Sequence, residues 1–336
     1  MIRVACLGAG YFSQFHYESW ARMDGARAVA ACDRDSAKAD AIGLTVYTDL
    51  ADMLQAETPD LLDIIVPPPG HAEAIRTALA HGVRWIICQK PFCENLDEAR
   101  ALTDEAEAAG ATLIVHENFR FQPWFREIKR ALDDGRIGAA YQCGFRLRPG
   151  DGQGPDAYLN RQPYFQTMPR FLIHETGVHF IDVFRFLFGD PDHAYADLRR
   201  LNPVIAGEDA GFFLLDHPNG VRTLFDGNRL MDHVADNHRL TMGEALIEGE
   251  AGALTLAGDG SVAFRAKGSK TSEQVLGADT GRGFAGDCVH ALQSHVIAAM
   301  NDQGALENTA REYLEVIEIE AALYRSAEEG QKVSLR

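Results

Sequence analysis

Short apolar runs alternate with segments of helical periodicity along the first 120 residues. The runs at 2–7, 26–32, 61–66, 84–88 and 112–115 have the continuity of strands that are buried on both faces. Between them lie amphipathic segments, among which 71–81 and 96–109 end at a glycine, as helices often do. This alternation predicts an α/β domain over residues 1–119, built as a doubly wound parallel sheet.

The pattern changes after residue 120. A helix is predicted at 123–132, a strand at 140–147 and a long irregular loop rich in proline and glycine at 149–169. After an apolar helix at 175–188, short alternating runs predict a mostly antiparallel sheet. These runs lie at 193–201, 210–215, 221–225, 239–242, 245–248, 253–256 and 261–266. With closing helices at 283–301 and 309–327, residues 120–336 are predicted to form a second, α+β domain with a large open sheet.

Composition narrows the classes of function. The chain has 336 residues, of which 46% are hydrophobic and 24% charged, with a formal net charge of −17. Such an acidic protein is a poor partner for nucleic acid or an anionic membrane. The six cysteines lack metal-ligand or disulfide spacing, so we predict buried thiols in a reducing, cytoplasmic protein without a metal site. No apolar run has the length of a membrane span.

The first strand leads directly into a glycine-rich turn. Gly8 would allow the tight turn, and Gly10 would let a phosphate approach the backbone at the start of the next helix. Ser13 stands where a third glycine is usual. Asp33 ends the second run, twenty residues later, where an acid would bind the ribose hydroxyls of a dinucleotide. The alternative is an ordinary strand–turn–helix with a chance acid.

Further candidates for chemistry lie on the apolar helix and after the fifth strand. Glu175, His179 and Asp182 are spaced by four and three residues, so an α-helix would place them on one face. Lys90 would emerge at the carboxyl edge of the sheet, where ligands bind. For each group a structural role is the alternative, and His71 could equally cap or pack its helix.

Together, six segments resemble the Gfo/Idh/MocA family, which includes glucose–fructose oxidoreductase and inositol dehydrogenase. They are GAGYFS at 8–13, Asp33, VPPPGH at 66–71, QKP at 89–91, ENFRFQP at 117–123 and HETGVHFID at 174–182. The resemblance implies an N-terminal Rossmann domain, a C-terminal domain with an open sheet, and a homodimer or homotetramer. It also implies an oxidoreductase that transfers a hydride between NAD, or NADP, and a secondary alcohol of a sugar, polyol or sugar acid.

The resemblance also implies roles for particular residues. Lys90, Glu175 and His179 would form the catalytic set, with His179 as base and Lys90 stabilising the substrate oxygen. The implied cofactor contacts are Gly8, Gly10, Tyr11, Phe12, Asp33, Arg34, Pro68, His71, Gln89, Lys90 and Asn118. The substrate contacts would be Lys90, Arg120, Arg161 and His179. Gln89 replaces the glutamate usual in the family, and Glu175 an aspartate found in many members.

Several alternatives stay open at this point. Asp33 favours NAD, whereas Arg34 could accept the 2′-phosphate of NADP. Arg120, Arg146, Arg161 and Arg170 could bind a substrate carboxylate or simply be solvated, and the loop 149–170 could be a lid. Other functions for such a chain are an NAD-using glycosidase, which oxidises its sugar transiently, and a non-catalytic dinucleotide sensor.

Overall fold

The computed structural model describes residues 1–93 and 95–335. The chain folds into two compact units that interleave in sequence. The first comprises Met1–Asn118 and Val289–Ile317, and the second comprises Phe119–Cys288 and Glu318–Arg336. The division at 119/120 therefore stays a prediction about domains, and by packing the segment Val289–Ile317 belongs with the first unit.

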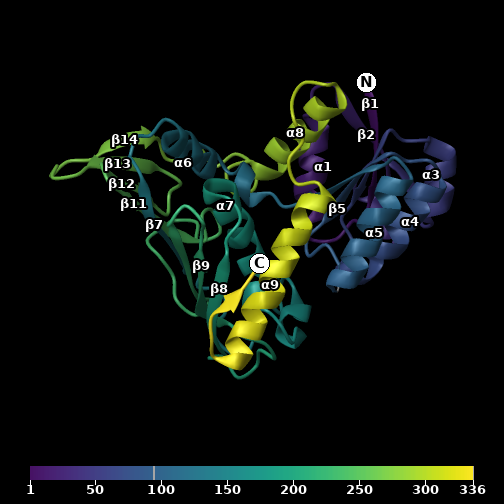
Figure 1. Ribbon diagram of the computed structural model, residues 1–336. Helices are drawn as coiled ribbons and strands as arrows, with labels where there is room; N and C mark the ends of the chain where they lie inside the picture. The colour runs from purple at the N-terminus through teal and green to yellow at the C-terminus, as the bar shows by residue number, and fades with distance from the viewer. Residues whose placement is uncertain (94, 336) are drawn as a thin grey trace. The chain divides into compact units, whose positions relative to one another are not determined.

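The first unit is built on a six-stranded parallel sheet with the order β3-β2-β1-β4-β5-β6. Figure 1 labels β1, β2 and β5 of this sheet. Its strands are β1 (Ile2–Leu7), β2 (Ala26–Cys32), β3 (Thr45–Tyr47), β4 (Leu61–Ile64), β5 (Trp85–Gln89) and β6 (Thr112–His116). The chain adds β2 and β3 on one side of β1 and then β4, β5 and β6 on the other, so the strand order switches between β1 and β4. Such sheets bind ligands at this switch point, at the carboxyl ends of the strands. The predicted doubly wound sheet is confirmed.

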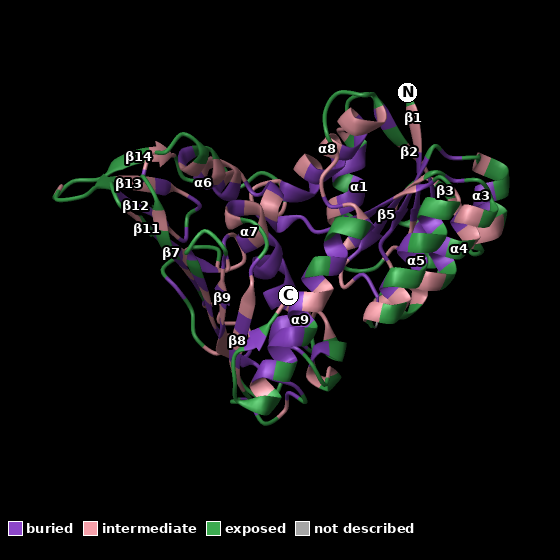
Figure 2. Cartoon of the chain, viewed as in Figure 1, coloured by how far each residue is buried: buried purple, intermediate pink, exposed green. Residues whose placement is uncertain are grey.

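Helices cover both faces of this sheet. They are α1 (Ser13–Ala21), α2 (Ser36–Asp40), α3 (Leu50–Glu57), α4 (His71–Ala80), α5 (Leu96–Ala108) and α8 (Cys288–Met300). Asp35, Asp49 and Asn95 cap α2, α3 and α5 by accepting backbone N–H bonds. Figure 2 shows buried strands flanked by α4 and α5, whose outward faces are exposed. A hydrogen bond between Ser19 and His290 (3.0 Å) joins α8 to α1.

The second unit is built on a nine-stranded sheet with the order β14-β13-β12-β11-β7-β10-β9-β8-β15. Its strands are β7 (Ala140–Leu147), β8 (His193–Arg199), β9 (Ala210–Asp216), β10 (Arg222–Asn228), β11 (Gly243–Gly249), β12 (Gly252–Leu256), β13 (Val262–Ala266), β14 (Glu273–Leu276) and β15 (Val333–Ser334). Within the described ranges β7 and β10 run parallel and the other pairs antiparallel. The predicted mostly antiparallel sheet is confirmed.

Helix α7 (Val178–Phe188) is buried on this sheet, as its apolar sequence predicts. Phe180 stacks on Phe145 of β7 with ring centroids 4.0 Å apart and lies 5.2 Å from Phe225 of β10. The other helices are α6 (Pro123–Asp133) and α9 (Ala310–Glu329), of which α9 belongs to the second unit from Glu318 onward. Ser326 of α9 accepts the backbone N–H of Ala196 in β8 at 3.1 Å.

Two local predictions are wrong. The strand expected at 239–242 is a turn, in which the Asn237 side chain accepts the N–H of Arg239 and Met242 has a φ of 59°. The α-helix expected from 175 begins only at Val178, because Leu172–Gly177 form a π-helical turn. A π-helical turn changes the side-chain spacing, so the 175/179/182 pattern does not define one α-helical face.

Candidate active site

The glycine turn after β1 has the geometry of a phosphate-binding loop. Gly8 has a φ of +112°, and a Cβ added there would lie 3.0 Å from the Ile65 carbonyl carbon. Only glycine fits such a position. A Cβ added at Gly10 would meet nothing within 4 Å, which leaves room for a phosphate at the amino end of α1. Ser13, the first residue of α1, donates its hydroxyl to the Gly10 carbonyl at 2.7 Å.

Asp33 follows β2 and is fixed by the backbone around it. Its Oδ2 accepts the Ala9 N–H at 2.8 Å, and its Oδ1 accepts the Asp35 N–H at 2.9 Å. Each carboxylate oxygen retains lone pairs that fit ribose hydroxyls. Arg34 is exposed next to it. The geometry therefore ties the predicted ribose-binding acid directly to the glycine turn.

The other predicted cofactor residues of this edge have varied surroundings. Tyr11 is 42% exposed, and Phe12 packs edge-on against Phe15. Pro68 begins the short 3₁₀ helix Pro68–Gly70. His71 is fully buried, with Nδ1 2.9 Å from the Phe92 carbonyl and Nε2 2.7 Å from the Val66 carbonyl.

His71 therefore joins the segment after β4 to the segment after β5. Burial lowers the pKa of His71, although its carbonyl partners oppose that shift. These contacts give His71 a structural function, and its contact with a cofactor stays a prediction.

Behind Lys90 lies a buried polar network that connects Gln89 to α1. Gln89 Oε1 accepts the Lys90 N–H at 2.9 Å, and Gln89 Nε2 donates to His16 Nε2 at 2.9 Å. His16 Nδ1 lies 2.8 Å from Oδ2 of Asp63 on β4, so the imidazole proton belongs on Nδ1. Trp20 Nε1–H donates to the same oxygen at 2.8 Å. Gln89 thus points inward and holds the backbone of Lys90.

Asn118 and its neighbours follow β6 at the same edge of the sheet. Asn308 donates to the Glu117 carbonyl at 2.7 Å, and the Tyr313 hydroxyl donates to Glu117 Oε2 at 3.3 Å. Asn118 is 3% exposed, and its Nδ2 has no hydrogen-bond partner within the described part of the chain. A buried amide donor of this kind fits a hydrogen-bond acceptor of a dinucleotide.

In the second unit, a π-helical turn carries Glu175 into helix α7. Glu208 Oε1 accepts the N–H groups of Phe171 (3.2 Å) and Ile173 (3.1 Å), and also the Tyr324 hydroxyl (2.6 Å). His174 Nδ1 lies 2.6 Å from Glu320 Oε1 on α9. Helix α9 and Glu208 therefore fix the start of this turn.

The three ionisable groups of the predicted stripe have separate surroundings. Glu175 Oε2 accepts hydrogen bonds from Arg229 Nη1 (3.2 Å) and the Thr176 hydroxyl (2.6 Å). His179 is 5% exposed and stacks on Phe119, with centroids 3.9 Å apart. Asp182 forms a two-pronged ion pair with Arg120, which explains how its carboxylate can be buried.

Three of the four arginines considered for a substrate carboxylate lie near a carboxylate of the protein. Arg120 pairs with Asp182, and Arg161 Nη2 donates to Asp151 Oδ2 at 2.9 Å. Arg170 lies over the Tyr324 ring at 4.3 Å, whereas Arg146 is exposed near Glu244. Their contacts with a substrate stay predictions.

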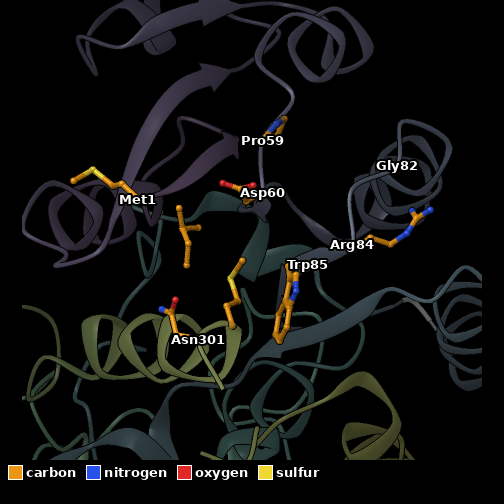
Figure 3. Close-up of a pocket in the computed structure, with 9 residues that line it drawn as sticks. Met1, Pro59, Asp60, Gly82, Arg84, Trp85 and Asn301 are labelled. Atoms are coloured by element: carbon orange, nitrogen blue, oxygen red, sulfur yellow. The ribbon is translucent and has the colours of Figure 1, made fainter. Parts of the chain in front are cut away.

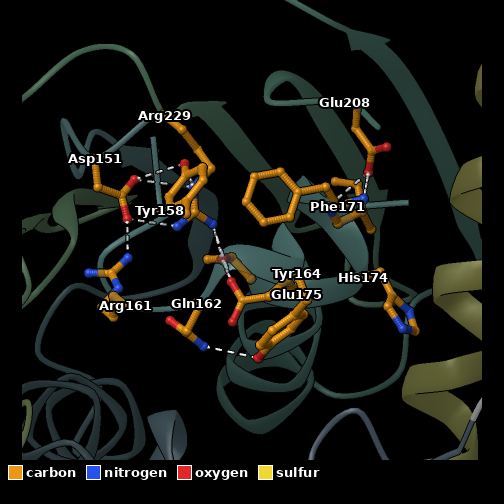
Figure 4. A network of polar contacts seen from close by, with 12 residues as sticks. Asp151, Tyr158, Arg161, Gln162, Tyr164, Phe171, His174, Glu175, Glu208 and Arg229 are labelled. Atoms are coloured by element: carbon orange, nitrogen blue, oxygen red, sulfur yellow. Dashed lines mark hydrogen bonds and ion pairs between the residues drawn. The ribbon is translucent and has the colours of Figure 1, made fainter. Parts of the chain in front are cut away.

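Sequence reasoning missed Asp151 and Arg229, which meet Glu175 in the network of Figure 4. Neither residue lies in a motif or at a helical spacing from Glu175. Only the tertiary fold brings the three together.

The loop 149–170 packs as a fixed part of the second unit. Tyr158, Phe165 and Phe171 form a buried cluster with Ala157 and Ile205. Asn202 Nδ2 donates to the carbonyls of Gly152 (2.8 Å) and Gly154 (2.9 Å). The loop thus has an apolar core of its own, and its function as a lid stays a prediction.

A cavity of about 510 Å³ lies in the first unit at the opposite edge of the sheet (Figure 3). Met1, Pro59, Asp60 and Trp85 line it, and they mark the amino ends of β1, β4 and β5. Since ligands of parallel sheets bind at the carboxyl ends, this cavity is distinct from the candidate site.

Residues 1–93 and 95–335 contain neither a candidate metal cluster nor a candidate membrane helix. No group of three or more His, Cys, Asp or Glu side chains could hold a metal ion. None of the helices is both long enough and apolar enough to cross a membrane.

Comparison with known proteins also indicates a dinucleotide-binding site in this chain. Residues 2–117 match the family model "Oxidoreductase family, NAD-binding Rossmann fold", and residues 125–255 match "GFO/IDH/MocA C-terminal domain". D-apiose dehydrogenase of Paraburkholderia graminis is 34% identical over 99% of this chain and 89% of its own length. Inositol 2-dehydrogenase of Rhizobium meliloti is 30% identical over 56% of each chain.

A solved structure resembles the whole chain. It is an oxidoreductase from Agrobacterium radiobacter in complex with NAD+, L-tartaric acid and magnesium, which has a TM-score of 0.89 and 29% identity. The match covers 99% of this chain and 98% of that one. The glycine turn, Asp33 and Asn118 fit a dinucleotide, and the family models match both halves of the chain. The chain therefore belongs to the Gfo/Idh/MocA family and is an NAD-dependent oxidoreductase.

Proposed function

We propose that the protein oxidises a secondary hydroxyl of a neutral sugar, and that D-apiose is the first substrate to test. The observation that carries this proposal is the 34% identity to D-apiose dehydrogenase over 99% of the chain. Lys90, Glu175 and His179 are all present at the positions implied by the family motifs. A homodimer or homotetramer remains part of the proposal.

The roles of these three side chains follow from their chemistry. When NAD is bound, its nicotinamide supplies the acceptor for the hydride of the carbinol carbon. His179 takes the hydroxyl proton as the imidazole general base. Lys90 donates a hydrogen bond to the same oxygen and stabilises its developing negative charge. Glu175 favours the protonated form of the imidazole electrostatically.

The charges of the second unit support a neutral substrate over a sugar acid. A substrate carboxylate binds best to an arginine whose charge is not already compensated. Arg120 and Arg161 are each paired with a buried or half-buried aspartate, Asp182 and Asp151. A carboxylate would therefore have to compete with a carboxylate of the protein.

We expect neutral sugars to react at least about tenfold faster than sugar acids, because an unpaired buried charge costs about 1.4 kcal/mol or more. The measurement is NADH formation at 340 nm, in kcat/KM, for a panel with D-apiose, myo-inositol, other sugars and their acids. Equal rates for the acids and their neutral counterparts would contradict the neutral-substrate proposal. Cleavage of a glycoside without net NADH would instead indicate the glycosidase alternative.

Asp33 should set the preference for NAD over NADP. Its carboxylate repels a 2′-phosphate and accepts a hydrogen bond from the free 2′-hydroxyl. Loss of a hydrogen bond to a charged group is worth about 1.5–3 kcal/mol, so NADH should bind about tenfold or more tightly than NADPH. Fluorescence titration measures both dissociation constants.

The variant Asp33→Ser should lose most of this preference. Asp40→Ser serves as the control, because Asp40 is an exposed acid at the end of α2. A wild-type protein that binds NADPH more tightly would show that Arg34 sets the preference.

A further inference from the structure

Arg229 lies directly after β10 with its guanidinium almost fully buried, at 1% side-chain exposure (Figure 4). Nη1 donates to Glu175 Oε2 at 3.2 Å and to the Thr176 hydroxyl at 2.8 Å. The other edge of the guanidinium faces Asp151, with Nε 3.2 Å from Oδ1 and Nη2 2.9 Å from Oδ2. The planar guanidinium of Arg229 thus joins the loop after β7 to the π-helical turn that carries Glu175.

The surroundings of Arg229 explain why a buried charge is tolerated. The rings of Phe171 and Tyr158 lie 4.7 and 5.2 Å from the guanidinium carbon. Asp151 receives a second guanidinium, from Arg161 at 2.9 Å. Burial raises the pKa of Asp151, but Arg229 and then Arg161 outweigh burial and the net shift is downward.

With Asp151 ionised, the two arginines face two carboxylates. The charges of the cluster therefore balance only if Glu175 is also ionised.

We propose that Arg229 is a positioning residue for Glu175: its guanidinium fixes Oε2 and holds the side chain as a carboxylate. Asp151 fixes Arg229 in turn and so determines where Glu175 lies. This inference rests on the proposed function, in which Glu175 is the active-site acid. It adds two residues to the site that no sequence motif identifies.

Charge and geometry make separate contributions to this role. Among the described contacts around Glu175, Arg229 and Thr176 lie at its Oε2, and Asp151, which also pairs with Arg161, lies across the guanidinium. Tyr164 is a further neighbour, whose pKa is raised by burial and then by the charge of Glu175. His179 follows one turn later on the helix. Arg229 is the cation that donates to Glu175 Oε2, so its removal disfavours the carboxylate and moves protonation of Glu175 to higher pH.

The test compares two variants in steady-state kinetics over pH. Arg229→Met/Asp151→Asn removes one positive and one negative charge together, so the net charge of the cluster is unchanged while Arg161 and Glu175 remain. We expect kcat to fall about tenfold or more and the acidic limb of kcat/KM to move up by about one pH unit or more. Arg229→Lys keeps the charge but loses the fork, so kcat should fall while the acidic limb stays close to wild type.

The control is Arg222→Met/Asp216→Asn, which removes an ion pair (2.8 Å) between β10 and β9, in which Arg222 is exposed and Asp216 is half-buried. Circular dichroism and NADH titration establish that each protein is folded and binds cofactor. A folded Arg229→Met/Asp151→Asn protein with wild-type kcat and pH profile would overturn the inference. If that protein does not fold, Arg229→Lys decides: a lowered kcat supports the inference and an unchanged kcat overturns it.

The wild-type protein separates this inference from the proposed function. If the wild type forms no NADH with any sugar, the proposed function fails and the inference fails with it. If the wild type is active and the variants match it, the inference alone fails.

Discussion

Replacing His179 or Lys90 with alanine is expected to lower kcat about a hundredfold or more while NADH still binds. General acid–base catalysis contributes about 10²–10⁴-fold, and a donor aimed at a developing oxyanion contributes about 10²–10³-fold. His179 is buried against Phe119. Lys90 directly follows Gln89, the last residue of β5, whose side-chain Oε1 accepts the Lys90 N–H. The measurement is kcat at 340 nm on the best substrate of the panel, beside fluorescence titration with NADH.

Matched controls separate this effect from a general loss of structure. His81→Ala removes an exposed histidine that contacts only the carbonyl of Thr77 among the described side-chain hydrogen bonds. Lys270→Ala removes an exposed lysine of the second unit. Both controls should retain wild-type kcat. If either active-site variant keeps a rate within about threefold of wild type, its activation free energy has changed by only about 0.7 kcal/mol. Such a result would remove that residue from the mechanism.

Replacing Asp63 with leucine is expected to lower the free energy of unfolding by about 3 kcal/mol or more. Asp63 is fully buried, and its Oδ2 accepts from His16 and Trp20, both at 2.8 Å, and from Gln293 Nε2 at 3.2 Å. Leucine would take the acceptor from three buried donors, those of His16, Trp20 and Gln293, and each unsatisfied donor costs about 1–3 kcal/mol. Urea unfolding followed by tryptophan emission measures the change.

The same substitution should also disturb the position of Lys90, because Gln89 connects His16 to the Lys90 backbone. His16 would lose the partner that fixes its tautomer, and Gln89 in turn orients the Lys90 backbone. Asp60→Leu is the matched control, because Asp60 lies one residue before β4 and accepts the N–H of Arg3 at an exposed position. An Asp63→Leu protein as stable as the control would show that the buried network does not contribute to the free energy of unfolding.

The sequence predicts the fold well where periodicity and glycine positions agree. The strands β1 and β2 have the predicted bounds, and His71 begins a helix as expected. The edge strand β14 escaped prediction because it is largely exposed and lacks a buried face. The turn at 239–242 has strand-like composition, but a side-chain bond of Asn237 and a positive φ at Met242 decide its conformation.

The candidate site is less predictable because long-range contacts define it. Motifs locate Asp33, Lys90 and His179, whose chemistry is tied to strand ends or helix position. They do not reveal that Gln89 reaches His16, since helix α1 and strand β5 are 73 residues apart at that contact. Nor do they reveal Arg229 beside Glu175, because a π-helical turn and a loop without periodicity set that geometry.

The central claim is that Lys90 and His179 act on one sugar hydroxyl. It is tested most directly by a crystal structure of the protein with NADH and the best substrate of the panel. The account predicts that Lys90 Nζ and a ring nitrogen of His179 both lie within about 3.2 Å of the same hydroxyl oxygen. A complex in which the two side chains contact different groups, or in which either faces away from the sugar, would contradict it.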